Sequence, residues 1–193
     1  MIFQGIIFDL DGVICSTDEY HYQAWKELAD REGIPFDRSV NNRLRGVSRM
    51  ESLEILLERA KRFYSQEEKE KMAAAKNTRY QELLREMTPA DLSPEVFETL
   101  ETLRKQGLKL AIGSSSKNTP LILDRLGLGG YFDAVSDGNN ITRSKPAPEV
   151  FLKAAEYLGL SPETCLVVED AVSGVEAAHR AGMKAAALGD AAK

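Results

Sequence analysis

The stretch Ile2–Phe3–Gln4–Gly5–Ile6–Ile7–Phe8–Asp9–Leu10–Asp11–Gly12 decides the fold. Its apolar part has the length and the β-branched and aromatic content of a strand buried on both faces. It ends in two carboxylates, Asp9 and Asp11, and ligands of open α/β sheets bind beyond the carboxyl ends of the strands. Burial of these carboxylates is costly unless a cation compensates their charge. Gly12 permits the tight turn that brings both to the rim of the sheet.

Taken alone, this Asp-x-Asp-Gly segment would favour the interpretation of a surface turn that has no chemistry. The second half of the chain favours the other interpretation, because apolar strand patterns alternate there with helical ones. This alternation predicts an α/β fold with a doubly wound parallel sheet. The predicted strands are 108–113, 131–135, 165–168 and 184–188, and the predicted helices are 94–106, 118–127, 148–158 and 171–181.

Residues 16–88 show only helical periodicity and contain no convincing strand. Three segments there match a capping box, Ser16–Glu19, Ser48–Glu51 and Ser65–Glu68, and each precedes apolar residues at helical spacing. Gly33 predicts the end of the first helix. We therefore expect a small helical-bundle cap domain at 16–88, inserted into an α/β core formed by residues 1–15 and 89–193.

Composition limits the class of protein. The chain has 193 residues, 25 basic and 30 acidic, and a net charge of -5, which argues against a nucleic-acid partner. Cys15 and Cys165 are far apart and have no zinc-binding spacing, so we expect both to be reduced and structural. No run reaches transmembrane length, and Asp9 and Asp11 interrupt any leader-like segment. These features predict a soluble cytoplasmic monomer without a membrane partner.

Polar residues gather at the predicted strand ends. Asp9 follows the first strand, Ser114, Ser115 and Ser116 follow the second, Glu169 and Asp170 follow the strand at 165–168, and Lys145 lies in a proline-rich loop. Together they suit phosphoryl transfer, which requires positioning and charge neutralisation. Two alternatives remain open. Lys145 could be a solvated surface lysine, and the acidic pair could cap the helix that follows it.

Several motifs carry a family resemblance. Phe8–Asp9–Leu10–Asp11–Gly12–Val13 resembles the signature of the haloacid dehalogenase superfamily of aspartyl-phosphate enzymes, and more closely the chain resembles its phosphoglucomutase branch. The resemblance covers about Ile6 to Gly189. Its other motifs are Tyr20–His21, Ala24–Trp25, Gly46–Val47–Ser48–Arg49, Ser116–Lys117–Asn118, Ser144–Lys145–Pro146–Ala147–Pro148 and Glu169–Asp170.

The resemblance implies a phosphosugar mutase that interconverts β-D-glucose 1-phosphate and glucose 6-phosphate through an aspartyl phosphate and a bisphosphate. Asp9 is then the nucleophile and Asp11 the general acid/base. Mg²⁺ is the implied cofactor, held by Asp9, the backbone carbonyl of Asp11, Glu169 and Asp170. Ser114, Ser115 and Lys145 are implied to contact the transferred phosphate. The alternative is a sugar-phosphate phosphatase of the same superfamily.

A second set of residues is implied to serve the rest of the sugar phosphate. Arg49, Ser116, Lys117 and Asn118 would hold the phosphate that is not transferred, and Arg45, Gly46, Val47 and Ser48 would form the sugar-specificity loop. Thr17 and His21 lie four residues apart on one helix face and would position Asp11, with Lys76 as the partner of His21. Without the resemblance, we would interpret Arg49 as a solvent-facing charge and His21 as a structural histidine.

Overall fold

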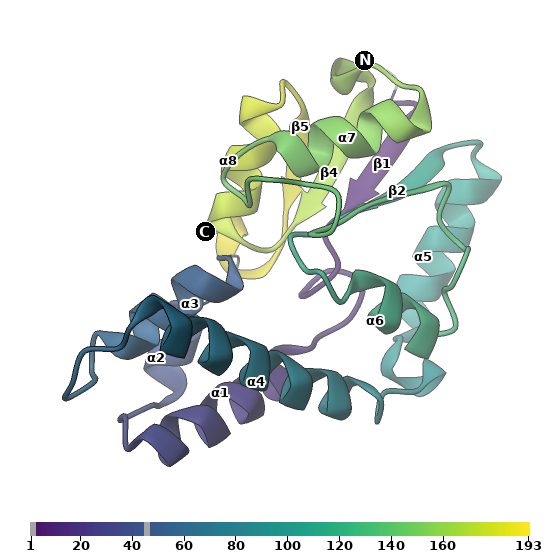
Figure 1. Cartoon of the computed structure of the whole chain (residues 1–193). Helices are drawn as coiled ribbons and strands as arrows, with labels where there is room; N and C mark the ends of the chain where they lie inside the picture. The colour runs from purple at the N-terminus through teal and green to yellow at the C-terminus, as the bar shows by residue number, and fades with distance from the viewer. Residues whose placement is uncertain (1–2, 45–46) are drawn as a thin grey trace. The chain divides into compact units, whose positions relative to one another are not determined.

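In residues 3–44 and 47–193, which the computed structural model describes, five parallel strands form one sheet in the order β3-β2-β1-β4-β5 (Figure 1). The strands are β1 (Gly5–Phe8), β2 (Lys109–Gly113), β3 (Ala134–Ser136), β4 (Cys165–Glu169) and β5 (Lys184–Ala187). β1 is central, with Gly5 opposite Lys109 of β2 and Cys165 of β4. The predicted parallel, doubly wound sheet is confirmed.

The chain divides into two compact units, which are described separately. One contains the N-terminal segment up to Ser16 together with Met87–Lys193, and the other is Thr17–Glu86. The first unit holds the whole sheet, with the helices α5 (Pro94–Lys105), α6 (Thr119–Arg125), α7 (Glu149–Leu158) and α8 (Val172–Arg180) and the 3-10 turns Pro89–Asp91, Pro162–Thr164 and Gly189–Ala192. Helices are the only secondary structure elements among the described residues of the second unit.

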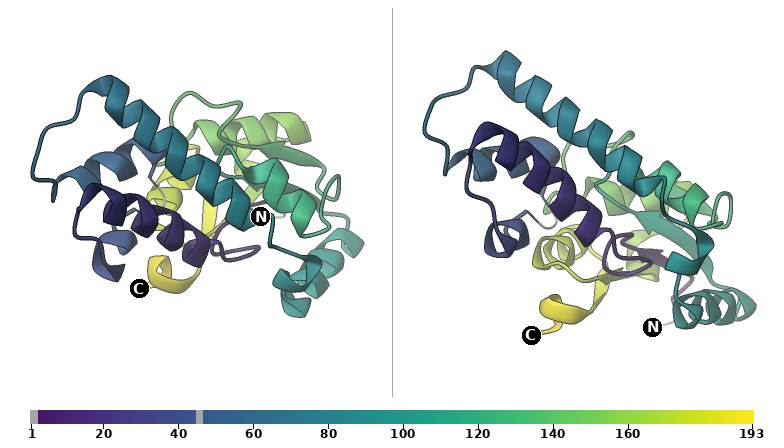
Figure 2. Two further views of the ribbon diagram at one scale, coloured as in Figure 1. Left: turned by 60° about the horizontal axis from the view of Figure 1, so that its bottom comes forward. Right: turned by 90° about the horizontal axis from the view of Figure 1, so that it is seen from below.

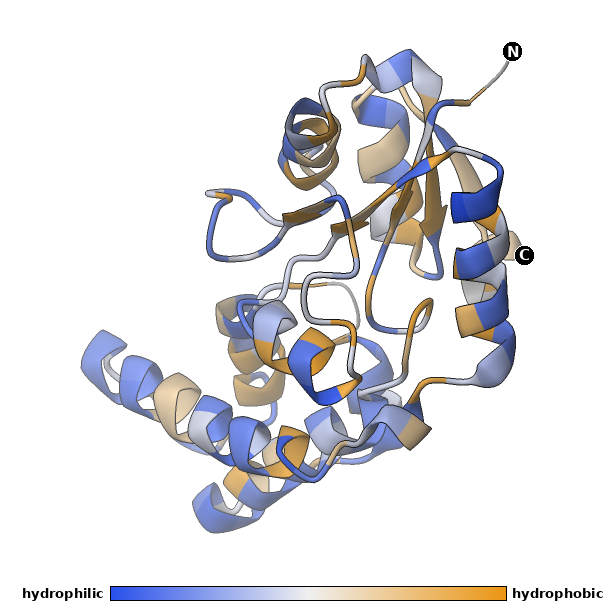
Figure 3. Ribbon diagram, turned by 90° about the vertical axis from the view of Figure 1, so that its right-hand side faces the viewer, coloured by the Kyte–Doolittle hydropathy of each residue, from blue (hydrophilic) through white to orange (hydrophobic). Residues whose placement is uncertain are grey.

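The sheet is apolar on both faces because helices cover both. Ile7 packs with Phe151 of α7 and Ala177 of α8 in one buried cluster, and α7 and α8 lie together on that side of the sheet. Strand residues alternate between faces, so Ile6 and Phe8 point to the opposite side, where α5 contacts β2. Coloured by hydropathy, the strands are predominantly apolar (Figure 3). Burial of both faces of the sheet explains why the strand sequences are continuous apolar runs.

In the part of the second unit that the structure describes there are four helices: α1 (Asp18–Glu32), α2 (Arg38–Asn42), α3 (Arg49–Leu57) and α4 (Gln66–Leu84). The two longest, α1 and α4, lie side by side (Figure 2). Trp25, Leu28, Leu53, Leu56 and Met72 belong to its buried core. This unit therefore has a hydrophobic core of its own.

Two local predictions differ from the structure. The capping boxes at Ser48 and Ser65 form, but the one predicted at Ser16 is wrong, because Thr17 is the N-cap residue of α1 and its side chain makes no capping hydrogen bond. The strand predicted at 131–135 begins only at Ala134. The side chain of Asp133 accepts a hydrogen bond from the Leu110 amide at 2.8 Å, so a carboxylate replaces the backbone partner there.

None of the helices in the described residues is long and apolar enough to cross a bilayer.

Candidate active site

The carboxyl edge of the sheet carries the polar residues predicted from the strand ends. Asp9 follows β1, and its amide donates to the carbonyl of Val168 on β4 at 2.9 Å. Ser114 follows β2, and its amide donates to the carbonyl of Ser136 on β3 at 3.0 Å. These bonds continue the pairing past the strand ends, and they fix the backbone from which both side chains project.

Lys145 lies at the centre of this edge. Its ammonium donates to Asp9 Oδ1 at 2.5 Å and to Glu169 Oε1 at 2.6 Å. Its side chain is only 3% exposed, and the ring of Phe151 lies beneath the ammonium, 4.8 Å away. Lys145 is therefore a buried bridge between two carboxylates, which excludes the alternative of a solvated surface lysine.

Three carboxylates converge here. Oxygens of Asp9, Glu169 and Asp170 all lie within 4.8 Å of one another. Burial is the main cause that raises the pKa of Asp9 to about 7, and Glu169 and Asp11 add to it, whereas Lys145 opposes it. Burial would lower the pKa of Lys145, but the charges of Asp9 and Glu169 outweigh it and raise that pKa. The cluster thus has three carboxylates, of which the ammonium contacts two, and the excess negative charge fits a divalent cation.

Glycines let the backbone approach these carboxylates. Gly12 has a φ of 91°, and a Cβ there would lie 2.1 Å from Asp170 Oδ2. A Cβ on Gly174, in the first turn of α8, would lie 1.8 Å from Glu169 Oε1. Glu169 uses its other oxygen to accept the Ala171 amide at 2.8 Å. Ala171 is the N-cap residue of α8 and no side chain makes a capping hydrogen bond there, so the alternative that the acidic pair caps this helix is wrong, and both residues belong to the acidic cluster.

Asp11 lies in a tight loop after Asp9. The Gly12 amide donates to the Cys15 carbonyl at 2.7 Å, and the Ile14 amide donates to the Leu10 carbonyl at 3.0 Å. The Asp11 side chain is half-buried. Its charge is close enough to contribute to the raised pKa of Asp9. The two carboxylates of the Asp-x-Asp-Gly segment therefore influence each other electrostatically.

The loop after β2 is held by its own hydroxyls. Ser114 Oγ accepts the Ser116 amide at 3.2 Å, and Ser116 Oγ accepts the Asn118 amide at 3.1 Å. The Lys145 amide donates to Ser115 Oγ at 3.5 Å. Lys117 is exposed and Asn118 is buried. The loop is a compact polar turn next to Lys145.

The second unit brings together a different group of predicted residues. Lys76 Nζ lies 2.9 Å from His21 Nδ1, so the predicted pairing of these two side chains is present. The Tyr80 hydroxyl donates to Thr17 Oγ1 at 2.9 Å, and the rings of Tyr80 and His21 stack with their centroids 4.0 Å apart. Lys76 also lies over the Trp25 ring at 4.8 Å. Sequence reasoning missed Tyr80, whose helical spacing identifies it only as a core residue.

Arg49 is the first residue of α3, and Ser48 is its N-cap, with Glu51 completing the capping box. Val47 and Ser48 are half-buried. Burial lowers the pKa of the Arg49 guanidinium. Arg45 and Gly46, predicted to belong to the specificity loop, lie outside the described residues.

Burial and the neighbouring positive charges predict that the imidazole of His21 is neutral. Burial lowers the pKa of His21 well below its ordinary value, and the charges of Lys76 and Arg49 lower it further. We expect the ring signals of His21 in NMR spectra to show no protonation between about pH 8 and pH 6. Lys76→Met should raise the pKa of His21, because it removes a nearby positive charge. Lys71→Met, on the exposed side of the same helix, is the matched control. A protonation midpoint near 6.5 in the unmodified protein would contradict this prediction.

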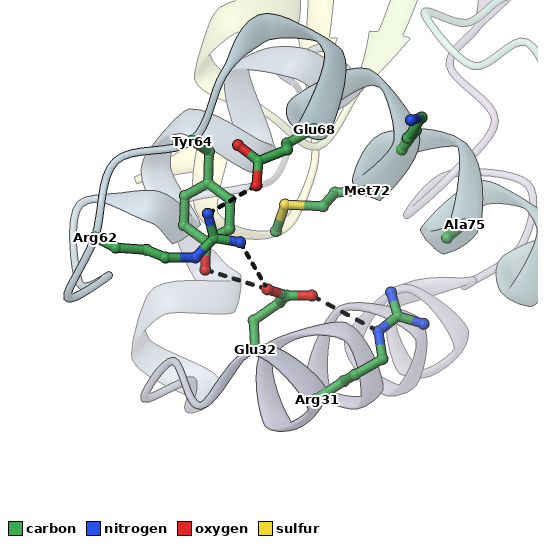
Figure 4. A pocket seen from close by; sticks show the side chains of 8 residues that line it. Arg31, Glu32, Arg62, Tyr64, Glu68, Met72 and Ala75 are labelled. Carbon is green, nitrogen blue, oxygen red and sulfur yellow. Dashed lines mark hydrogen bonds and ion pairs between the residues drawn. The ribbon is translucent and has the colours of Figure 1, made fainter.

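One surface pocket of about 310 Å³ lies in the second unit (Figure 4). Its charged groups pair with one another, since Arg62 donates to Glu68 at 2.8 Å and the Tyr64 hydroxyl donates to Glu32 at 3.3 Å. None of the predicted site residues lines it. We assign no ligand to this pocket.

Comparisons with known proteins place these residues in context. Residues 3–182 match the family of haloacid dehalogenase-like hydrolases. The beta-phosphoglucomutase of Bacillus subtilis is 44% identical over 96% of this chain and 83% of its own length. A crystal structure of beta-phosphoglucomutase from Clostridium difficile superposes with a TM-score of 0.91 at 39% identity, covering 98% of this chain and 86% of that one. A phosphorylated carbohydrates phosphatase of Thermotoga maritima is 35% identical over 94% of this chain and 82% of its own length.

Proposed function

Because the chain belongs to the haloacid dehalogenase-like hydrolase family, we propose that it is a phosphosugar mutase that interconverts β-D-glucose 1-phosphate and glucose 6-phosphate. The membership confirms the resemblance predicted from the motifs. One observation carries the proposal: a relative named beta-phosphoglucomutase is 44% identical over 96% of this chain. The protein is accordingly an isomerase, and a sugar monophosphate is its substrate.

In the proposed reaction, Asp9 carries the phosphoryl group between the two ends of the sugar. An oxygen of the Asp9 carboxylate attacks phosphorus, and the bond from phosphorus to the leaving sugar oxygen breaks. Asp11 donates a proton to that oxygen, and in the other direction it takes a proton from the attacking hydroxyl. The phosphoryl group passes from Asp9 to a monophosphate, which gives a bisphosphate, and Asp9 then accepts the other phosphoryl group.

Lys145 favours the ionised, nucleophilic form of Asp9. Its ammonium, 2.5 Å from Asp9 Oδ1, lowers the pKa of a carboxyl group that burial raises. It also supplies positive charge where the charge of the transferred phosphate would lie, and we propose Ser114 and Ser115 as its neighbours in that contact. The residues proposed for the other phosphate are Ser116, Lys117 and Asn118, with Arg49 of the second unit. Val47 and Ser48 belong with Arg49, and Thr17, His21 and Lys76 are proposed to act on Asp11.

The acidic cluster fits a magnesium ion. Asp9, Glu169 and Asp170 offer three carboxylates that lie within 4.8 Å of one another, and Asp11 would add its backbone carbonyl. Oxygen ligands of this kind are those that Mg²⁺ prefers. When bound, the ion would neutralise charge that develops on the transferred phosphate.

Protons should compete with this ion. The pKa of Asp9, about 7 in the metal-free protein, means that the carboxyl group is protonated below neutral pH and must release its proton when Mg²⁺ binds. We expect the apparent Kd for Mg²⁺ to rise by up to about tenfold for each pH unit below 7 and to level off above it. Calorimetry in buffers of different ionisation enthalpy would count the released proton. Asp9→Asn should lose this pH dependence, and a Kd that stays constant below pH 7 would contradict the prediction.

The runner-up function is hydrolysis of the aspartyl phosphate by water, since a relative named as a phosphatase is 35% identical. The deciding experiment supplies β-D-glucose 1-phosphate, Mg²⁺ and a catalytic amount of a glucose bisphosphate. It measures formation of glucose 6-phosphate and of inorganic phosphate in the same sample. A mutase forms the isomer with little free phosphate. Stoichiometric phosphate release without the isomer would replace the proposal by the phosphatase.

A further inference from the structure

A second loop supports the loop that follows β2. Residues 137–140, Asp-Gly-Asn-Asn, follow β3, the neighbour of β2 in the sheet. Both loops leave the carboxyl edge side by side, because the Ser114 amide already donates to the carbonyl of Ser136. The loop after β2 therefore leaves the sheet next to the loop after β3, which is close enough to hold its backbone.

Two hydrogen bonds connect the loops. The Gly138 amide donates to the Ser116 carbonyl at 3.1 Å, and Asn139 Nδ2 donates to the Lys117 carbonyl at 3.0 Å. Among the described residues the only cis peptide bond is Lys145–Pro146, so these peptide units are trans. In a trans peptide the N–H points opposite to the C=O. Holding these two carbonyls therefore also sets the direction of the following amides: that of Lys117, and that of Asn118, which donates to Ser116 Oγ within the loop.

Gly138 is required by space. A Cβ at this position would lie 2.5 Å from the Ser115 carbonyl oxygen and 2.8 Å from the Lys117 amide nitrogen. Its φ is outside the left-handed region, so conformational freedom does not explain the glycine. The backbones of the two loops approach so closely that any side chain at 138 would separate them.

The supporting loop is itself well fixed. The Asp137 amide donates to Asn140 Oδ1 at 3.0 Å, and the Asn139 amide donates to Asp137 Oδ1 at 2.8 Å. Lys153 of α7 donates to the Asn140 carbonyl. Asp137 and Gly138 are buried, whereas the Asn139 side chain is exposed. Asn139 is thus held in place by its backbone, and its side chain is available to hold Lys117.

We propose that Gly138 and Asn139 are positioning residues, which fix the backbone of residues 116–118, and with it the direction of the Lys117 amide, for the phosphate that is not transferred. This inference rests on the proposed function, because it takes from it the role of the 116–118 segment. The inference adds a determinant of substrate specificity, because the loop after β3 would decide whether the second phosphate of the substrate is recognised. Transfer to Asp9 itself does not depend on it.

The test compares two reactions of the purified protein. Asn139→Ala removes one hydrogen bond from an exposed side chain, so folding should be unaffected. We expect its kcat/KM for β-D-glucose 1-phosphate to fall roughly three- to tenfold, mainly through a higher KM, because one net hydrogen bond is lost. Phosphorylation of Asp9 by acetyl phosphate, which has no second phosphate, should keep its rate. Asn139→Gln keeps an amide donor and should restore most of the mutase activity.

Gly138→Ala should show the same split with a larger loss. Its matched control is Gly129→Ala, where a Cβ would meet no atom closer than 3.6 Å and where activity should be unchanged. If Gly138→Ala does not fold, the Asn139 variants still decide the question. Equal mutase activity of Asn139→Ala and the unmodified protein, or an equal loss in both reactions, would overturn the inference. Failure of the proposed function looks different, because the unmodified protein would then form no isomer at all.

Discussion

Asp9→Asn is expected to abolish turnover in both directions and to prevent formation of the phosphoryl-enzyme. The amide has nearly the same shape as the carboxylate, but it is neutral and a much weaker nucleophile, so the covalent step is lost. Removal of an attacking group commonly costs several powers of ten, and we expect a loss of roughly 10⁴-fold or more. The rate of isomer formation and the mass of the intact protein after treatment with acetyl phosphate measure the two effects.

The fold should survive this change. Asn at position 9 removes one charge from a cluster with excess negative charge, so stability at neutral pH should not fall sharply. Asp124→Asn, an exposed substitution of the same type on α6, is the matched control and should leave both activities unchanged. Normal turnover by the Asp9→Asn protein would eliminate the aspartyl-phosphate mechanism.

Lys145→Met should damage both catalysis and stability. The ammonium is the partner of two buried carboxylates, and removing one member of such a group typically costs about 3–5 kcal/mol of unfolding free energy. Lys145 also lowers the pKa of Asp9. Without it that pKa should rise above 7, so Asp9 would be mostly protonated at neutral pH and unable to attack. We expect phosphorylation by acetyl phosphate to fall by at least about two powers of ten.

The pH dependence distinguishes this cause from a simple packing defect. The loss of stability should be larger at about pH 8, where Asp9 of the variant begins to ionise without an ammonium as its partner. It should shrink towards about pH 5, where Asp9 takes up a proton and the repulsion is relieved. Urea unfolding at both pH values measures the difference, with the exposed Lys105→Met as control. A loss of stability that is equal at both values would show that Lys145 acts through packing alone.

Much of the core site follows from the sequence because the sheet is parallel. Once the strands at Phe8, Gly113 and Val168 are identified, their carboxyl ends must meet at one edge. Asp9, Ser114 and the acidic pair must then meet there as well. The loop of Lys145 has no such constraint, and its place was predictable only from the family motif. That its ammonium joins Asp9 to Glu169 is a tertiary contact without a local signal.

Other features were beyond local reasoning for identifiable reasons. The segment Ser16–Glu19 has the residue types of a capping box, but Thr17 takes the N-cap position. Its hydroxyl accepts a hydrogen bond from the hydroxyl of Tyr80, which lies far along the chain. Gly174 is essential only because Glu169 folds back against it. Residues 137–140 carry a recognisable turn composition. That signal predicts a loop, however, and does not indicate which neighbour the loop supports.

The central position of β1 has a consequence for synthesis of the chain on the ribosome. β1 is translated before the other strands of the sheet, yet its partners begin only at Lys109 and Cys165. The whole of Thr17–Glu86, which has its own core, is translated before either partner exists. A nascent chain therefore carries Asp9, the proposed nucleophile, long before it gains Lys145, Glu169 and Asp170. The proposed site is thus complete only after the helical unit has been made, and we expect chains that terminate before Lys145 to be inactive.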